Sequence, residues 1–287
     1  MKKYRTVFIG NRPLILSCLL NHPQIDLVHA FVIQGSLIPE EDCVGVPVTV
    51  CDPKDGSKVL DFLHAGEYDI CASGGCPYIL PISKLPLDKV YINSHPSALP
   101  FGKGIHPINE CILSSHKKAG STLHYLVDKL DAGDIIHQVT FDVTDDIDLD
   151  LLYSFIFKLE KEVFVEGLDK VLAADLKYVG EPQYGDGTYY SRKSDDLFAN
   201  IHTIGTQEFL EKARAFSSDS LGVRFKCNGQ EIVVFKAMLI TNEFVNRRFE
   251  SISPGSLIVS NKNLLLLRLL DGIVKIDKWF IPNHEVH

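Results

Sequence analysis

Residues 6–20 of this 287-residue chain read TVFIGNRPLILSCLL, and this pattern is repeated through the first half of the sequence. The apolar run Thr6–Ile9 predicts a buried strand, and the apolar residues of Leu14–Leu20 predict a helix after a short turn. Further strands are expected at Leu27–Ile33, Val46–Val50, Tyr68–Ala72 and Val90–Asn93, and a further helix at Ser57–His64. This alternation is typical of an α/β protein with a Rossmann-like, doubly wound and mostly parallel sheet.

The pattern changes in the second half of the chain, after strands expected at Thr122–Val127 and Asp134–Val143 and helices at Ile105–Ser114 and Leu149–Ala173. Beyond a turn-rich bridge and a helix near Thr206–Phe216, strands are expected at Gly222–Lys226, Glu231–Ile240, Ser256–Val259, Leu264–Leu270 and Ile273–Trp279. Asn228-Gly229 and Asp271-Gly272 are hairpin signals. We therefore expect a catalytic domain over residues 1–180, a linker over 181–205 and a smaller β-rich, barrel-like domain over 206–287.

Composition and charge argue against several classes of protein. The chain is 45% hydrophobic and 23% charged, which is ordinary for a globular protein. The formal net charge is −8, so a basic field that attracts nucleic acid is absent at the level of the whole chain. Seven scattered cysteines lack zinc or disulfide spacing, and no apolar stretch approaches the roughly 20 residues of a membrane span. These features predict a cytoplasmic chain with reduced thiols and no membrane segment.

Polar residues follow the strand expected at Val90–Asn93, where residues 92–100 read INSHPSALP. Asn93 and His95 are two residues apart and so point to the same side of a strand. They lie at its carboxyl end, where open α/β sheets bind ligands. Asp131 follows His95 by 36 residues, in the acidic turn LDAGDI at 130–135. Taken singly, each motif is also explained by ordinary turn chemistry.

Together and in this order, these motifs resemble the folate-dependent formyltransferase family. The resemblance covers about residues 1–175 and is carried by NSHPSALP at 93–100, Gly104, GSTLH at 120–124 and LDAGDI at 130–135. The stretches YYSRK at 189–193, RAF at 214–216, PGS at 254–256 and DG at 271–272 are similar to the second domain of the longer members. The resemblance implies transfer of a formyl group from N10-formyltetrahydrofolate, as co-substrate and without a metal, to a primary amine.

The resemblance also implies roles for individual residues. Asn93, His95 and Asp131 would be catalytic, because an amide and an imidazole can stabilise a developing oxyanion and a carboxylate can orient the imidazole or relay a proton. The division of acid and base roles between His95 and Asp131 stays open. His124 matches a family position that we interpret as packing. The residues implied at the folate site are Tyr78, Ile79, Leu80, Leu99 and Asp134, with core packing as an equal alternative for Tyr78 and Ile79.

Candidates for the acceptor site come from three places. They are Gly10, Asn11 and Arg12 in the turn after the first strand, Lys103, and Tyr190, Arg192 and Lys193. A helix N-terminus beside Arg12 suits an anion, although a solvated loop charge is the favoured interpretation of this residue. Lys103 stands where many members of the family have Arg, which puts a contact from that position in doubt. For the stretch from Tyr189 to Lys193, a plain strand that carries surface charges is the favoured alternative to a binding site.

Three interpretations of the function remain. The protein could formylate an amino-sugar nucleotide, it could formylate methionyl-tRNA, or it could bind folate or a sugar nucleotide without catalysing a reaction. The loop Gln34–Gly45, where the tRNA enzymes carry a basic insertion, is acidic here. Residues 181–287 carry 13 basic and 13 acidic side chains, so residues 1–180 hold the whole negative charge and the second domain offers no basic field. We therefore expect a small-molecule amino-sugar nucleotide, as in lipopolysaccharide O-antigen biosynthesis, with no nucleic-acid or membrane partner. A homodimer formed through the β-rich domain is compatible with the sequence.

Overall fold

The computed structural model describes residues 1–39, 43, 45–261 and 264–282. Internal contacts divide the chain into two units, which are described separately. Unit 1 comprises Met1–Pro107, Lys118–Asp142 and Ser154–Tyr190, and unit 2 comprises Ile108–Lys117, Val143–Tyr153 and the described residues from Ser191 onward. The chain passes between these units several times, whereas the sequence-based division has one linker at 181–205.

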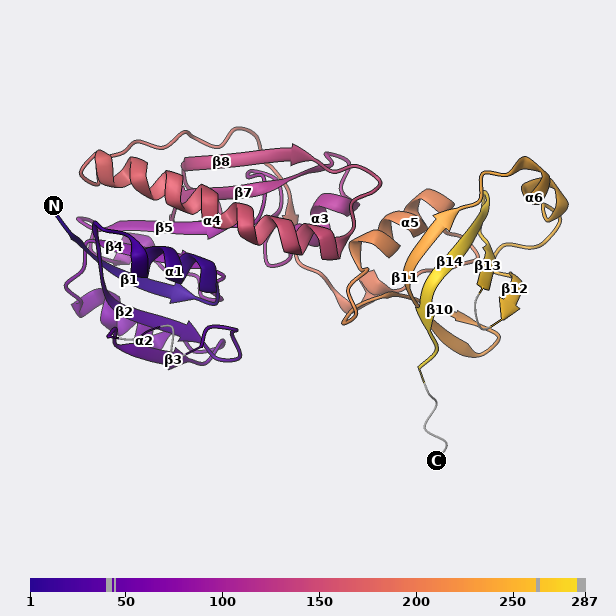
Figure 1. Cartoon of the computed structure of the whole chain (residues 1–287), viewed down its shortest axis with the longest axis horizontal. Helices are drawn as coiled ribbons and strands as arrows, with labels where there is room; N and C mark the ends of the chain where they lie inside the picture. Colours follow the sequence, from indigo (N-terminus) through magenta and orange to yellow (C-terminus); the bar gives the residue numbers. More distant parts are fainter. Residues whose placement is uncertain (40–42, 44, 262–263, 283–287) are drawn as a thin grey trace, which may run out of the picture. The chain divides into compact units, whose positions relative to one another are not determined.

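A seven-stranded sheet forms the centre of unit 1 (Figure 1). Its strands are β1 (Tyr4–Gly10), β2 (Ile25–Ile33), β3 (Val48–Cys51), β4 (Ile70–Gly74), β5 (Val90–His95), β7 (Lys118–Tyr125) and β8 (Ile135–Asp142). They lie in the order β3-β2-β1-β4-β5-β7-β8, with β3 to β5 parallel and β7 antiparallel to both of its neighbours. The chain order reverses between β1 and β4, and sheets of this type bind ligands at the carboxyl ends beside such a reversal.

Helices cover both faces of this sheet. They are α1 (Pro13–Asn21), α2 (Ser57–Ala65) and α4 (Leu149–Ala173). Successive side chains of a strand point to opposite faces. Phe8 accordingly packs in one apolar cluster with residues of α1 and α4, while its neighbours Val7 and Ile9 pack in another with residues of α2. Burial on both faces explains why β1 is an unbroken apolar run.

Short elements complete unit 1. Strand β6 (Lys103–Gly104) pairs in parallel with β9 (Tyr189–Tyr190), and the short 3-10 helix η2 (Ile82–Lys84) precedes β5. The plain strand favoured for the two tyrosines is therefore present, whereas β6 and η2 were not predicted, because such short elements carry no periodic pattern. The expected helix after Gly104 is present as α3 (Pro107–Leu113), whose residues from Ile108 on belong to unit 2.

Unit 2 contains a five-stranded antiparallel sheet that curls into a half-barrel (Figure 1). Its strands are β10 (Val223–Cys227), β11 (Gln230–Leu239), β12 (Leu257–Asn261), β13 (Leu264–Arg268) and β14 (Ile273–Phe280), in the order β10-β11-β14-β13-β12. Its helices are η3 (Ser194–Leu197), α5 (Thr206–Ala215) and α6 (Glu243–Arg248), of which η3 and α6 were not predicted. Asn228 and Gly229 both have positive φ, as the predicted hairpin turn requires. The predicted fold class, a Rossmann-like sheet with a β-rich C-terminal domain, is confirmed.

Within the described ranges, no helix is both long and apolar enough to cross a membrane.

Candidate active site

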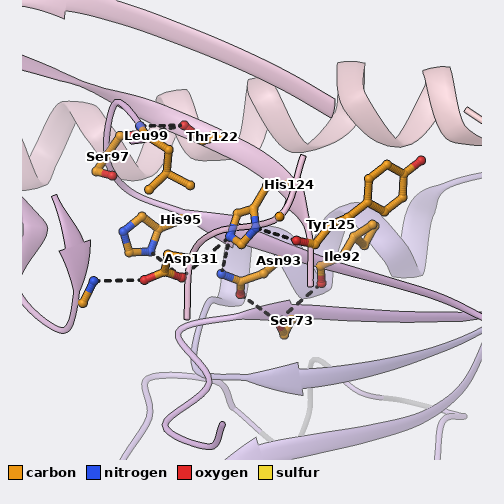
Figure 2. A network of polar contacts seen from close by, with 12 residues as sticks. Ser73, Ile92, Asn93, His95, Ser97, Leu99, Thr122, His124, Tyr125 and Asp131 are labelled. Atoms are coloured by element: carbon orange, nitrogen blue, oxygen red, sulfur yellow. Dashed lines mark hydrogen bonds and ion pairs between the residues drawn. The ribbon is translucent and has the colours of Figure 1, made fainter. Parts of the chain in front are cut away.

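Asn93 lies on β5, opposite Ser73 of β4 and opposite His124 of β7 in the register of the sheet. Directly opposite residues on neighbouring strands share a face, so the three side chains form a row (Figure 2). The Ser73 hydroxyl donates to Oδ1 of Asn93 at 2.6 Å, and Nδ2 of Asn93 lies 3.2 Å from Nε2 of His124. Among the residues that the structure describes, the second N–H of this amide has no acceptor. It is therefore available to a substrate oxygen.

His95 is the last residue of β5 and is buried. Its Nε2 lies 2.8 Å from the carbonyl oxygen of Gly102, which can only accept, so Nε2 carries the hydrogen. In the neutral imidazole Nδ1 is then a free base, and it lies 3.8 Å from Oδ1 of Asp131. The loop beyond His95 is tied to β7, because the Thr122 hydroxyl donates to the carbonyl oxygen of Ser97 at 2.7 Å. The ring of His95 and the loop that follows it are therefore both fixed by hydrogen bonds.

Asp131 lies in the turn between β7 and β8 with a φ of 50°, a conformation that aspartate tolerates better than most residues. Its side chain is only 5% exposed, which is unlike an ordinary turn aspartate. Oδ2 accepts a hydrogen bond from the backbone N–H of Gly104 at 2.9 Å, and the Asp131 carbonyl accepts one from Nε2 of Gln183 at 3.0 Å. Oδ1 points toward His95 and His124 and accepts no hydrogen bond from any described residue (Figure 2).

His124 belongs to this polar network, which corrects its interpretation as a packing residue. Besides the contact with Asn93, its Nδ1 lies 2.8 Å from the carbonyl oxygen of Tyr125, and its Nε2 lies 3.7 Å from Oδ1 of Asp131. Burial lowers the pKa of His124 to about 4, against the opposing effect of the Asp131 carboxylate. The motif GSTLH at 120–124 had pointed to His124 in the sequence. A sequence motif gives the position of a residue, however, and does not show which side chains it contacts.

Arg12 is not a solvated loop charge, so the favoured interpretation of this residue is wrong. Its Nε donates to Oε2 of Glu160 at 3.2 Å, its Nη1 donates to Oδ1 of Asn11 at 2.8 Å, and its guanidinium lies 4.5 Å from the centre of the Phe157 ring. Glu160 has a side chain only 1% exposed, and burial raises its pKa while Arg12 lowers it. Sequence reasoning missed Glu160, although a glutamate directly after Leu159 interrupts the apolar side of α4.

Glycines let the turns after β1 and β4 approach each other at the sheet reversal. A Cβ on Gly10 would lie 2.0 Å from the carbonyl oxygen of Gly74, and a Cβ on Gly75 would lie 1.9 Å from Oδ1 of Asn11. Gly75 also has a φ of 67°, which side-chain-bearing residues rarely adopt. The backbone N–H of Asn11 donates to the carbonyl oxygen of Gly74 at 3.0 Å. The predicted acceptor turn Gly10–Arg12 is therefore a packed part of the carboxyl edge.

Lys103 lies on β6, directly before the Gly104 amide that binds Asp131, and is only 5% exposed. Burial lowers the pKa of its ammonium, and Asp131 opposes this effect. Within the described part of the chain this ammonium has neither a hydrogen bond nor an ion pair. Tyr190 is half-buried on β9, which pairs with β6. A cation that makes no ion pair with a described residue therefore lies near the candidate catalytic carboxylate.

The residues predicted at the folate site fall into different environments. Leu80 and Leu99 are buried, with Leu80 in the apolar cluster of α2, whereas Ile79 is 68% exposed. Core packing is therefore wrong for Ile79, whereas the partly buried Tyr78 packs against the same apolar cluster as Leu80. The Tyr78 ring lies against Gly56 and its hydroxyl donates to the carbonyl oxygen of Asp52, so that side chain is bound to the loop before α2. Asp134 is exposed.

Arg192 and Lys193 belong to unit 2, whereas Tyr190 belongs to unit 1. Nη1 of Arg192 lies 3.4 Å from Oδ1 of the fully buried Asn109, and Lys193 is exposed. These three residues are not gathered within one unit. The acidic part of the loop Gln34–Gly45, residues 40–42, lies outside the described residues.

The cysteines form no disulfide, and five of the seven are buried. Burial raises the pKa of Cys76 to about 12, so this thiol stays protonated. In the described ranges, no cluster of three or more His, Cys, Asp or Glu side chains is arranged to hold a metal ion.

Comparison with known proteins places this geometry in context. Residues 55–168 match the family described as formyl transferase. The methionyl-tRNA formyltransferase of Thermotoga neapolitana is 28% identical over 250 residues, covering 83% of this chain and 77% of that protein. The structure of WlaRD, a sugar 3N-formyl transferase with dTDP and 5-N-formyl-THF, matches with a TM-score of 0.71 and 19% identity over 99% of both chains. An N-formyltransferase from Helicobacter canadensis, in complex with folinic acid and dTDP-3-aminofucose, matches with a TM-score of 0.70 and 18% identity over 98% of this chain and 100% of that one.

An amide, an imidazole and a carboxylate at the carboxyl edge of an open α/β sheet define an enzyme suited to moving a small acyl group. All three side chains lie within the matched segment 55–168. The predicted resemblance to the folate-dependent formyltransferases is confirmed over this segment, and so is the predicted enzyme class.

Proposed function

We propose that this protein transfers the formyl group of N10-formyltetrahydrofolate to the primary amine of a nucleotide-linked amino-deoxysugar. One observation carries the formyl chemistry: Asn93 offers a free N–H, Asp131 a free carboxylate oxygen and His95 a free ring nitrogen to the same region of the carboxyl edge. Formyl transfer to an amine needs one donor for the developing oxyanion, one acceptor for the amine hydrogens and one base for the departing proton.

The roles follow from which atoms are already engaged. The Asn93 amide donates its second N–H to the formyl oxygen, where negative charge develops. Oδ1 of Asp131 accepts an N–H of the acceptor amine and so aims its lone pair at the formyl carbon. Nδ1 of His95 accepts the proton that the amine must lose, since Nε2–H is bound to Gly102. Asp131 then stabilises the resulting imidazolium.

The new bond joins the amine nitrogen to the formyl carbon, and the bond from that carbon to N10 breaks. The folate supplies the activated formyl group and leaves as tetrahydrofolate, with the electron pair on N10 and the proton returned from His95. The Asn93 amide retains an unused N–H that can donate to the carbonyl oxygen of the formyl group, so the residues present suit this co-substrate.

Several observations favour an amino-sugar nucleotide as the acceptor. The two structures described above, a sugar 3N-formyl transferase with dTDP and a formyltransferase with dTDP-3-aminofucose, align over nearly the whole of this chain, including the β-rich unit. Residues 181–287 are electrically neutral in sum, and phosphate contacts normally supply most of the affinity for RNA. The buried ammonium of Lys103 offers a charge for an anionic substrate group.

Methionyl-tRNA is the second candidate acceptor, since several curated relatives similar in sequence are methionyl-tRNA formyltransferases. This sequence similarity does not distinguish the two acceptor classes. A cytoplasmic location, a homodimer and a place in O-antigen biosynthesis stay predictions.

A direct assay distinguishes the amino-sugar nucleotide from methionyl-tRNA as the acceptor. The purified full chain is incubated with N10-formyltetrahydrofolate and, in parallel, with dTDP- and UDP-linked 3-amino and 4-amino sugars or with methionyl-tRNA, and tetrahydrofolate release is followed. We expect release with one class of amino-sugar nucleotide. Release with methionyl-tRNA alone would overturn the sugar assignment, and no release with any amine would overturn the formyl transfer.

A further inference from the structure

Three neighbouring strands of unit 1 place one continuous hydrogen-bonded row beside the site. It runs from Ser73 on β4 through Asn93 on β5 to His124 on β7 and ends on the carbonyl oxygen of Tyr125 (Figure 2). The side chain of Asn93 is the middle member, with one neighbour at each end of its carboxamide. The row therefore decides how that carboxamide is oriented.

With a neutral His124 ring, the row has one consistent assignment of hydrogens. The Tyr125 carbonyl only accepts, so the hydrogen of the neutral ring lies on Nδ1 of His124. Nε2 is then an acceptor, and it receives an N–H from Asn93. The opposite end of the amide, Oδ1, receives the Ser73 hydroxyl. This arrangement satisfies every polar group of the row except the second N–H of Asn93, which has no acceptor among the described residues.

The geometry points to His124 as a positioning residue that keeps the NH₂ end of the Asn93 carboxamide, and not its carbonyl end, on the side of Asp131. Nε2 of His124 is the shared neighbour of both groups, 3.2 Å from Nδ2 of Asn93 and 3.7 Å from Oδ1 of Asp131. A ring protonated on Nε2 would face the Asn93 NH₂ donor to donor. Turning the carboxamide over relieves that conflict but withdraws the N–H from the formyl oxygen. This inference rests on the proposed function, because it assigns the orientation of the oxyanion donor.

The surroundings of His124 keep its ring neutral. The residue is fully buried, and burial lowers its pKa to about 4. Asp131 raises that pKa, whereas His95, with its ring centre 6.4 Å away, and Lys103 lower it. The ring is thus an acceptor throughout the neutral pH range, which is the state that the orientation requires.

Two substitutions separate positioning from packing. His124→Leu keeps the apolar bulk and removes the acceptor, and we expect kcat to fall roughly 10- to 100-fold, in line with the loss of one oriented hydrogen-bond donor, with little change in the KM for folate. His124→Gln restores an acceptor near Nε2, and we expect it to recover most of the lost kcat. The same reduction with leucine and with glutamine would overturn the positioning role.

Epistasis with Asn93 is the sharper measurement. In an Asn93→Ala background, His124→Leu should lower kcat no further, because no carboxamide remains to be oriented. Additive loss would mean that His124 acts on the fold and would overturn the inference. His29 is a matched control, since it is a partly buried histidine of β2 whose Nε2 contacts the Thr49 hydroxyl at 2.9 Å. His29→Leu should show additive effects with Asn93→Ala.

A measurement independent of turnover distinguishes this inference from the proposed function. Nitrogen-15 NMR of the histidine rings of the intact chain should show His124 as the neutral Nδ1–H tautomer at pH 7. An Nε2–H tautomer or an imidazolium would overturn the positioning role even if formyl transfer is observed. The expected tautomer without transfer to any amine would overturn the function and leave the orientation of Asn93 standing.

Discussion

Oδ1 of Asp131 lies 3.8 Å from Nδ1 of His95, too far for a hydrogen bond, while Oδ2 of the same carboxylate is bound to the Gly104 amide. One oxygen thus anchors the carboxylate, and the other remains available beside Nδ1 of His95. An incoming amine can contact both the free oxygen and the ring nitrogen. Because the two oxygens of Asp131 have different partners, a substitution can keep the bond to Gly104 while it removes the negative charge.

Asp131→Asn should preserve the anchor, since an amide oxygen can still accept from Gly104, but it removes the charge that supports the His95 imidazolium. We expect kcat to fall by about 10²- to 10⁴-fold in this variant and equally in His95→Ala. The unfolding midpoint of Asp131→Asn in urea should be nearly unchanged. His64→Ala, at an exposed position on α2, is the control. Near-normal turnover of either site variant would remove that residue from the mechanism.

Arg12→Met should destabilise unit 1 strongly, because it leaves the buried carboxylate of Glu160 without its cation. Breaking such a pair costs about 3–5 kcal/mol, and the double variant Arg12→Met/Glu160→Gln should recover much of the loss. Urea unfolding measures the free energy of unfolding of the single and of the double variant. The exposed pair of Arg5 and Glu67 is the comparison, and Arg5→Met should cost under about 1 kcal/mol. Equal losses at Arg5 and Arg12 would contradict the buried pairing.

Gly75→Ala and Gly35→Ala form a matched pair, since both glycines have positive φ. A Cβ at Gly35 meets no atom of the described residues within 4 Å, so its cost should be the backbone strain alone, about 1–2 kcal/mol. A Cβ at Gly75 would collide with Asn11, so the loss of unfolding free energy should exceed that of Gly35→Ala by at least about 2 kcal/mol. Indistinguishable urea midpoints would show that the two turns do not approach each other.

His124 should make stability depend on pH. Its folded pKa of about 4 lies below the ordinary value of 6.5, so the unfolded chain binds the proton more readily. The stability is complete above pH 6.5 and is lost as the pH falls toward 4, by up to about 3 kcal/mol. His124→Gln should flatten that part of the urea-derived pH profile. An unchanged slope between pH 6.5 and 4 in the variant would contradict the buried neutral ring.

Lys103→Met should raise stability and impair function together. It removes a buried ammonium without a described partner, which favours folding, and it removes a charge beside Asp131 that an anionic substrate group can use. We expect a higher urea midpoint together with a KM for the acceptor raised about tenfold. Lys118→Met, at an exposed position on β7, provides the reference. A lower midpoint with unchanged KM would show that Lys103 serves the fold alone.

Local pattern was enough to predict most of the fold. Alternating apolar runs located the strands and helices of both units within a few residues, because burial on one or two faces imposes a period on the chain. Pairs such as β6 with β9 were missed, since two residues carry no period and only the partner strand holds them in place.

By itself, the sequence determined the fold class, the formyltransferase resemblance and the candidate catalytic set Asn93, His95 and Asp131, because strand-end position and spacing are local properties. Tertiary structure alone decided which atoms are free to react. It bound Arg12 to Glu160, brought His124 to the amide of Asn93 and anchored Asp131 on Gly104. The physical reason is that burial and hydrogen-bond partners set the charge and orientation of a side chain. Those partners come from strands, turns and a helix up to 148 residues apart in the chain.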